Sequence, residues 1–372
     1  MSQYKIITEA GDLKDKRVLV RLDLNLPLVD GKVGNDYRVE KSLDTLNFLK
    51  NSGAKIIILA HIGRDKNETL RPVSDYLNNI LPHKFISDIY ADNAKQEVDS
   101  MSSGDILLFE NLRQHDGEKN NSLEFVEYLA SFGDIYVNEA FSNSHRDHAS
   151  MTGLARKLPS YAGIRLDEEV KNLSKAFNPP TPFLLIVGGA KFETKLPLVK
   201  KFTSIANMVF LGGALSNDVF RLKGFAMDSS VTSDTPLSEI EDLVNTTKVM
   251  VPSDVVVNTR EIKAPGQVLP EEIVMDAGPQ SVEILKGLIR GAKLIVWNGP
   301  LGFYEKGFTD STNAVVEAII ESEAQVVIGG GDIQSAVSGF DLPEKIFLST
   351  GGGAMLDFLS NETLVAIEAL KA

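Results

Sequence analysis

Two lysines, four positions apart, follow a pair of glycines in the stretch IVGGAKFETK at residues 186–195. Glycine lets the backbone approach a ligand closely, and the ammonium groups of Lys191 and Lys195 could pair with phosphate oxygens. The stretch does not match the GxxxxGK[ST] phosphate-binding loop, because no serine or threonine follows the lysine to hold a metal ion. Taken alone, it fits a phosphate site and a tight strand-to-helix turn with two solvated lysines about equally well.

Further glycine-rich turns occur in the second half of the chain. GGGDIQSA (329–336) and STGGGAML (349–356) each place three glycines where a strand should lead into a helix. A helix N-terminus presents free N–H groups and partial positive charge, which suits phosphate. Asp332 offers the kind of oxygen ligand that Mg²⁺ prefers, although aspartate is also a common helix cap. Because no GxGxxG is present, the pattern favours a mononucleotide site over a dinucleotide cofactor.

The first half carries cationic groups instead. Nine of the twelve arginines and all five histidines lie within residues 1–165. A single surface arginine is usually solvated or ion-paired, but several at strand ends are typical of a pocket for phosphate or carboxylate. A small phosphorylated acid is the simplest ligand for such a pocket, and zinc at HRDHAS (145–150) is disfavoured because no third ligand has suitable spacing. The groups concerned are Arg21, Arg38, Arg64, Arg113, Arg146, His61, His145 and His148.

Short apolar runs that alternate with amphipathic stretches must position these groups. The alternation predicts parallel sheets covered on both faces, and ligands of such sheets bind beyond the carboxyl ends of the strands. We therefore expect two Rossmann-like parallel-sheet domains, each a three-layer α/β/α sandwich, joined by a hinge helix. The expected strands lie within residues 17–24, 54–60, 105–110, 134–140, 183–189, 208–213, 254–257, 293–299 and 325–331, and the expected helices at 38–51, 123–132, 166–177, 214–223, 281–290 and 311–321.

Length and composition restrict the class of protein. A chain of 372 residues suggests two domains, and we expect them at 1–166 and 183–360, joined by a hinge helix and linker at 167–182 near KAFNPPTP. Residues 361–372 are expected to form one more helix. A net charge of −13 disfavours a nucleic-acid-binding role, and the absence of cysteine excludes thiolate chemistry. No apolar stretch of membrane-spanning length and no signal peptide is apparent, so we expect a cytoplasmic protein without a membrane partner.

Eight motifs in order along the chain resemble those of the phosphoglycerate kinase family: VRLDLNLPL, AHIGR, LFENLRQHDGE, NEAFSNSHRDHAS, VGGAKFETK, WNGPLGFYE, GGGD and STGGGA. The resemblance implies a cytoplasmic, monomeric enzyme that transfers a phosphoryl group reversibly between 1,3-bisphosphoglycerate and ADP, giving 3-phosphoglycerate and ATP with Mg²⁺. It also implies that the C-terminal segment returns to the first domain. Both acceptor groups are already ionised near neutral pH, so the reaction needs charge stabilisation and domain closure rather than a general base.

The resemblance also assigns roles to residues. Arg38, Lys191 and Lys195 would surround the transferred group, and Asp332 would hold the metal ion. The phosphoglycerate would be bound by Asp23, Leu24, Asn25, Arg38, His61, Ile62, Gly63, Arg64, Arg113 and Arg146. The nucleotide would be bound by Lys191, Lys195, Gly213, Asn298, Glu305, Gly330, Gly331, Asp332 and Ile333.

The sequence departs from the family pattern at several positions. Ile333 stands where the family usually has threonine or serine, which removes one hydroxyl contact to phosphate but keeps the backbone amide. Asp65, Gln114 and the SNS segment at 142–144 also differ from the usual residues. A catalytically silent nucleotide-binding sensor is the alternative from another class, with Ile333 in its favour and the retained lysines against it. An NAD-dependent dehydrogenase is disfavoured by the missing dinucleotide fingerprint.

Overall fold

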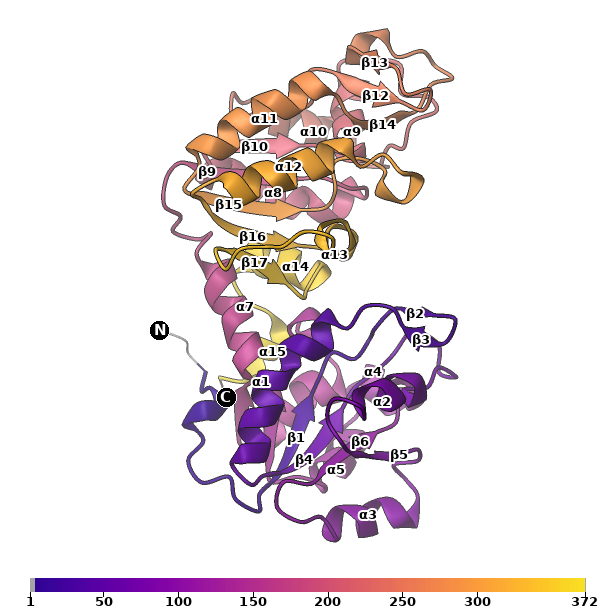
Figure 1. Ribbon diagram of the computed structural model, residues 1–372, viewed down its shortest axis with the longest axis vertical. Coiled ribbons are helices and arrows are strands. Elements are labelled where there is room, and N and C mark those ends of the chain that lie inside the picture. Colours follow the sequence, from indigo (N-terminus) through magenta and orange to yellow (C-terminus); the bar gives the residue numbers. More distant parts are fainter. Residues whose placement is uncertain (1–3, 372) are drawn as a thin grey trace. The chain divides into compact units, whose positions relative to one another are not determined.

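The computed structural model describes residues 4–371. Its chain divides into two compact units, one formed by residues 4–171 together with 363–371 and the other by residues 172–362 (Figure 1). The division falls inside helix α7 (Ile164–Ser174), which starts two residues before the helix expected at 166–177 and ends three residues before it. No helix among the described residues is both long enough and apolar enough to cross a membrane.

The first unit is built on a six-stranded sheet in which every neighbouring pair is parallel. Its four central strands are buried on both faces, which explains their apolar sequences, whereas the two edge strands are partly exposed. In spatial order they are β5 (Lys84–Ile86), β6 (Ile106–Phe109), β4 (Lys55–Leu59), β1 (Arg17–Arg21), β7 (Ile135–Asn138) and β8 (Ser160–Ala162).

Helices cover both faces of this sheet. Leu46 and Leu49 of α1 (Tyr37–Asn51) join the apolar cluster formed with Ile56 and Ile58 of β4, and Figure 1 shows α1 lying along the sheet. On the other face, the ring of Phe109 meets that of Phe132 edge-on at 5.1 Å. The other helical segments of the unit are η1 (Ile7–Glu9), α2 (Arg71–Leu77), α3 (Asp92–Asp99), η2 (Leu112–Gln114), α4 (Asp116–Lys119), α5 (Leu123–Ala130), η3 (Phe141–Asn143), the π-helical η4 (Ala149–Gly153) and α6 (Leu154–Lys157), and a hairpin pairs β2 (Leu28–Val29) with β3 (Lys32–Val33).

The second unit also contains a six-stranded, all-parallel sheet. The chain builds outward from β9 in one direction and then from β15 in the other, so the strand order reverses between these two neighbours. Ligands of doubly wound sheets bind at this kind of reversal. In spatial order the strands are β11 (Val249–Met250), β10 (Met208–Leu211), β9 (Phe183–Val187), β15 (Leu294–Asn298), β16 (Gln325–Gly329) and β17 (Ile346–Ser349).

This sheet is again the middle of three layers. Figure 1 shows α11 and α12 side by side over one face, where Leu285 and Val315 pack into the cluster that contains Trp297. The opposite face receives Phe202 of α8, whose ring meets Phe183 edge-on at 5.9 Å. The expected three-layer α/β/α fold class is therefore confirmed. The helical segments of this unit are α8 (Phe192–Ile205), α9 (Ala214–Leu222), α10 (Leu237–Val244), η5 (Pro265–Gln267), α11 (Pro279–Gly291), η6 (Tyr304–Lys306), α12 (Asp310–Glu321), α13 (Gly331–Val337) and α14 (Gly353–Asn361).

Two local expectations were wrong. The run DVVV, expected to be a strand of the parallel architecture, forms β12 (Val255–Val257) in a separate antiparallel sheet with β13 (Ile262–Lys263) and β14 (Val274–Ala277). Residues 361–371 do not form one helix, because Glu362 adopts a left-handed conformation (φ 64°) that ends α14, and residue 372 of the expected helix lies outside the described residues. Only α15 (Val365–Ala369) follows, and the Ala366 side chain packs on Ala140 and Met151 of the first unit.

Candidate active site

The strand ends of the first unit bring the expected anion-binding residues to one edge. Asp23 and Asn25 follow β1, His61 follows β4, Arg113 lies in η2 after β6, and Arg146 lies beyond β7. The strands are parallel, so their carboxyl ends all lie at the same edge of the sheet. Three residues of this group are buried: Asp23, His61 and Arg113.

Arg38 is held by the segment that follows β1. Its guanidinium forms an ion pair with Asp23 (Nη1–Oδ2 3.1 Å) and donates a hydrogen bond to the Asn25 carbonyl (3.0 Å). Asp23 also accepts a hydrogen bond from the Ser142 hydroxyl, within the unusual SNS segment. The Arg38 side chain is partly exposed, so it is oriented by these bonds and still accessible to a ligand.

The loop after β4 is fixed through its backbone. The Asn25 side chain accepts a hydrogen bond from the Gly63 amide (2.8 Å), and Arg113 donates one to the Gly63 carbonyl. Leu24 and Ile62 are buried, so only their backbones could face a ligand, whereas Arg64 is exposed. Gly63 has a φ of 63°, in the region that favours glycine.

The cations of this edge oppose one another electrostatically. Burial and repulsion by Arg146 and Arg21 lower the pKa of Arg113 to about 10. Burial, Arg21, Arg113 and Arg146 hold the pKa of His61 well below its usual value, and burial with the same arginines lowers the pKa of His148 to about 4. A bound anion would relieve this repulsion, so the cluster has the electrostatics of an anion site.

Arg21 does not line the pocket with its neighbours, contrary to the sequence-based interpretation. Only 1% of the residue is exposed, and its guanidinium donates to the Ser150 hydroxyl (2.8 Å), to the Leu22 carbonyl and to His61 Nδ1 (2.8 Å). Ser150 in turn donates to the buried carboxylate of Glu118 (2.6 Å). Glu118 and Ser150 are the last residues of the motifs LFENLRQHDGE and NEAFSNSHRDHAS, but the sequence assigned neither of them a role, because a motif does not show which of its side chains support the others.

In the second unit, glycine turns follow the strands at the point where the strand order reverses. After β9 and β15, the Gly188 amide donates to the Asn298 carbonyl (2.8 Å) and the Gly189 amide to the Pro300 carbonyl (2.6 Å). Gly213, after β10, has a φ of 58°, and a Cβ atom there would lie 2.6 Å from the Gly189 nitrogen. Only glycine fits this position, which answers why the loops are glycine-rich.

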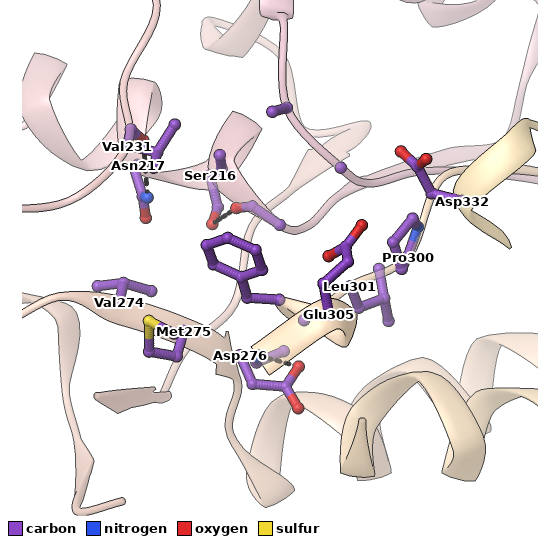
Figure 2. A pocket seen from close by; sticks show the side chains of 17 residues that line it. Ser216, Asn217, Val231, Val274, Met275, Asp276, Pro300, Leu301, Glu305 and Asp332 are labelled. Atoms are coloured by element: carbon purple, nitrogen blue, oxygen red, sulfur yellow. Dashed lines mark hydrogen bonds between the residues drawn. The ribbon is translucent and has the colours of Figure 1, made fainter. Parts of the chain in front are cut away.

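A pocket of about 340 Å³ opens beside these turns, within the second unit. Its walls include Gly189, Gly213 and Pro300, and the carboxyl-bearing residues Glu305 and Asp332 also line it. In Figure 2, Asp332 lies at one end of the pocket and Asn217 and Val231 lie at the other. A cavity of this size with a mostly apolar lining and a few carboxylates suits a small organic ligand that is polar at one end.

The two lysines of the opening stretch have different environments. Lys191 is exposed and caps α8 in a left-handed conformation (φ 63°), a strained state for a non-glycine residue that is typical of functional sites. Lys195 is buried, and its ammonium donates to the Gly188 carbonyl and to the Ala190 carbonyl (3.0 Å). Burial lowers the pKa of Lys195 to about 8, with Asp332 acting in the opposite direction.

The GGGD turn leads directly into α13, with Gly330 (φ 127°) as its N-cap and Gly331 and Asp332 in its first turn. The Asn298 side chain is buried and donates to the Gly329 carbonyl (2.7 Å), so it ties β15 to β16. Ile333 is completely buried in the core cluster of the unit. Its side chain is taken up by the core, so the residue can offer a ligand only its backbone amide.

Several residues that line the pocket escaped sequence analysis. Asn217 from α9, Val231 from the following loop, and Met275 and Asp276 from β14 all contribute to the wall. Asp276 is buried and accepts a hydrogen bond from the Ser311 amide (3.2 Å), which links β14 to the start of α12. Their sequences carry no glycine turn or cationic motif, so no local signal marks them.

One α/β unit presents clustered cations at the carboxyl ends of its strands and the other a small-molecule pocket among glycine turns, which is the arrangement of an enzyme for an anionic substrate and a second small molecule. The family model described as "Phosphoglycerate kinase" matches residues 7–362. This chain is similar to the phosphoglycerate kinase of Xanthobacter flavus, with 36% identity over 100% of each chain. It is also similar to that of Wolbachia pipientis wMel, with 38% identity over 98% of each chain. The solved phosphoglycerate kinases of Coxiella burnetii (31% identical, TM-score 0.85, covering 99% and 98%) and Pyrococcus horikoshii OT3 (28%, 0.87, 98% and 98%) share its fold.

The chain belongs to the phosphoglycerate kinase family. The reaction expected from the sequence, reversible phosphoryl transfer between 1,3-bisphosphoglycerate and ADP in glycolysis and gluconeogenesis, is thereby confirmed. The enzyme is a phosphotransferase with a carboxyl group as acceptor.

Proposed function

We propose that the cation cluster of the first unit binds 3-phosphoglycerate or 1,3-bisphosphoglycerate. The observation that carries this assignment is that Asn25, His61, Arg113 and Arg146 follow the carboxyl ends of neighbouring parallel strands. Burial and then repulsion among the arginines lower the pKa values of the last three, and a bound anion would relieve that repulsion. Guanidinium groups also match the geometry of phosphate and carboxylate oxygens. In this proposal Arg64, which is exposed, reaches the ligand from the rim.

The pocket of the second unit takes ADP or ATP in the same proposal. Its position at the reversal of strand order and its size support a nucleotide. The phosphates would lie toward Asp332 and the first turns of α13 and α14, where backbone amides are free to donate. Glu305 would bind the ribose, and the base would extend toward Asn217 and Val231.

Mg²⁺ would be held by Asp332 together with the phosphates. No group of three side chains suited to holding a metal ion occurs among residues 4–371, so an ion here would take its other ligands from phosphate oxygens and water. The ion would neutralise charge on the phosphates. Arg38, Lys191 and Lys195 would then stabilise the charge that spreads over the transferred group, and no residue needs to remove a proton.

Phosphoryl transfer would require the two units to close, with residues 167–182 as the hinge. Residues 1–166 and the C-terminal segment would form the phosphoglycerate-binding domain, and residues 183–360 the nucleotide-binding domain. Closure would exclude water that could hydrolyse the acyl phosphate. Small-angle scattering measures this directly: the radius of gyration should fall when both substrates are added, and an unchanged profile would contradict the closure.

A coupled assay of ATP formation from 1,3-bisphosphoglycerate and ADP, with and without Mg²⁺, tests the proposal as a whole. Turnover that depends on Mg²⁺ and is lost in Asp332→Ala would support it. Nucleotide binding without turnover would favour the catalytically silent sensor instead.

We also propose that the enzyme acts as a cytoplasmic monomer on small molecules, without a nucleic-acid or membrane partner. The net charge of −13 supports the first exclusion, because nucleic-acid binding relies on clustered positive charge. Size-exclusion chromatography with light scattering would test the monomer against the chain mass of 40.6 kDa.

A further inference from the structure

Arg21 lies directly beneath the cation cluster, and its side chain can influence a ligand chiefly through the residues that it contacts. It is almost fully buried, and each of its three nitrogen atoms donates to a protein acceptor. One of these acceptors is His61, which the proposed function places at the phosphoglycerate. The hydrogen bond between Arg21 and His61 therefore determines what the imidazole can offer that ligand.

The direction of this hydrogen bond fixes the tautomer of His61. A guanidinium group has only donors, so the Nδ1 atom of His61, 2.8 Å from Arg21 Nη2, must be the acceptor. A neutral imidazole that accepts at Nδ1 carries its proton at Nε2. No residue in the described part of the chain forms a hydrogen bond with Nε2, so this N–H is available to a ligand.

Arg21 is itself oriented by a chain of hydrogen bonds with fixed directions. The Glu118 carboxylate, which is completely buried, accepts from both the Ser150 amide (2.9 Å) and the Ser150 hydroxyl (2.6 Å). The hydroxyl proton is thereby committed to Glu118, and the hydroxyl oxygen accepts from Arg21 Nε (2.8 Å). In the series Glu118, Ser150, Arg21 and His61, every hydrogen bond therefore has a fixed donor and a fixed acceptor.

We propose that Arg21 is a positioning residue that holds His61 as the neutral Nε2–H tautomer, so that the ring can donate a hydrogen bond to the substrate but cannot accept one. The inference rests on the proposed binding of phosphoglycerate at this cluster. In this role His61 donates a hydrogen bond without carrying a charge and without acting as a general base.

The surroundings of His61 act in the same direction. Burial lowers the pKa of His61, and repulsion by Arg21, Arg113 and Arg146 adds to it. His148 is the other titratable group near the ring, and its own lowered pKa leaves it neutral near neutral pH. An imidazolium ion is therefore disfavoured near neutral pH, and the neutral donor is the form that meets the substrate. A donor without charge can still bind phosphate or carboxylate oxygen while adding nothing to the repulsion among the arginines.

Two-bond ¹H–¹⁵N correlation spectra of protein labelled with ¹⁵N-histidine test the tautomer directly. We expect the Nε2–H pattern for His61 near neutral pH, assigned by its loss in His61→Gln. His83 is an internal reference of opposite sense, because its Nδ1 lies 2.8 Å from the Leu81 carbonyl, which can only accept, and its Nε2 lies 2.9 Å from the Ser74 hydroxyl. An Nδ1–H or imidazolium pattern for His61 in the wild-type enzyme overturns the inference.

Kinetics of Arg21→Met, with Arg21→Lys as the control that keeps the charge, test the functional consequence. We expect Arg21→Met to raise the KM for 3-phosphoglycerate by about tenfold above neutral pH, with a smaller effect on kcat. The KM defect should shrink only in acid below the ordinary range of histidine, where the buried His61 becomes protonated and donates from Nε2 without help. A KM increase that is equal in both variants and independent of pH overturns the positioning role of Arg21. If Arg21→Met does not fold, the tautomer pattern of His61 in the wild-type spectrum remains the test of the inference.

Titration with 3-phosphoglycerate separates this inference from the function on which it rests. A His61 Nε2 signal that shifts on saturation supports both. If the Nε2–H pattern is present but saturating 3-phosphoglycerate does not move it, the ligand assignment fails while the tautomer stands. If the tautomer is Nδ1–H and the signal moves, the ligand assignment stands and the present inference fails.

Discussion

Replacing Lys195 with methionine should remove most activity and change the stability of the fold in a way that depends on pH. The side chain is buried, and burial lowers its pKa from 10.5 to about 8. A shift of this size means that keeping the ammonium charged in the folded protein costs about 3 kcal/mol. Methionine has a similar length and no charge, so it removes this cost.

The lost hydrogen bonds act against that gain. The Lys195 ammonium donates to the Gly188 and Ala190 carbonyls, and bonds of a charged group contribute about 1.5–3 kcal/mol each. Together the two bonds contribute about 3–6 kcal/mol against a gain of about 3 kcal/mol, so the variant should be equally or moderately less stable near neutral pH, and the diagnostic quantity is the pH dependence. Between about pH 8 and 10.5 the unfolded chain binds a proton at Lys195 that the folded state lacks, and wild-type stability should rise relative to the variant.

Urea unfolding of both proteins across this pH range measures the difference, because other ionisations cancel in the comparison. We expect the wild type to gain about 3 kcal/mol over Lys195→Met as the pH rises through the window. The coupled assay should show kcat lowered by roughly 100- to 1,000-fold, the usual effect of losing one preorganised charge. Lys191→Met is the matched control, since Lys191 is exposed and its loss should hardly affect stability.

A stability difference that stays constant across the window would show that Lys195 is not held below its ordinary pKa, and the argument from burial would fail. Turnover close to that of the wild type would remove Lys195 from the groups that stabilise the transferred phosphoryl group.

Three further predictions concern other parts of the molecule. Arg64→Ala should raise the KM for 3-phosphoglycerate and leave kcat nearly unchanged, because Arg64 is exposed at the rim; an unaltered KM would exclude it from the site. Asp332→Asn should raise the Mg²⁺ concentration needed for half-maximal activity, measured by metal titration, and an unchanged requirement would assign the metal elsewhere. Burial raises the pKa of Glu139 to about 8 from its ordinary 4.5, so the wild type should lose stability as the pH rises between these values. Glu139→Gln stays neutral and should melt above the wild type beyond about pH 8, whereas parallel melting curves would contradict the raised pKa.

The sequence alone determined the features that are set within a few residues. Apolar runs such as those of β1, β4, β9 and β15 predicted buried parallel strands, because these segments are covered on both faces. The glycine pair after β9 and the GGG run before α13 predicted turns into helices, since their backbones need conformations that other residues avoid. The alternation of apolar runs with amphipathic stretches also predicted that the cationic groups of the first half would lie at strand ends.

Only the tertiary structure decided which side chains are accessible to a ligand and which are buried beneath those that are. In the sequence Arg21 cannot be told from the other arginines of its half, yet it is buried beneath the cation cluster and donates a hydrogen bond to His61. Ile333 reads as a missing hydroxyl, yet its side chain belongs to the core. The far end of the pocket combines α9 and the loop after it with β14, which comes much later in the sequence. Burial and hydrogen-bond partners depend on segments that meet only after folding, and no local pattern of residues encodes them.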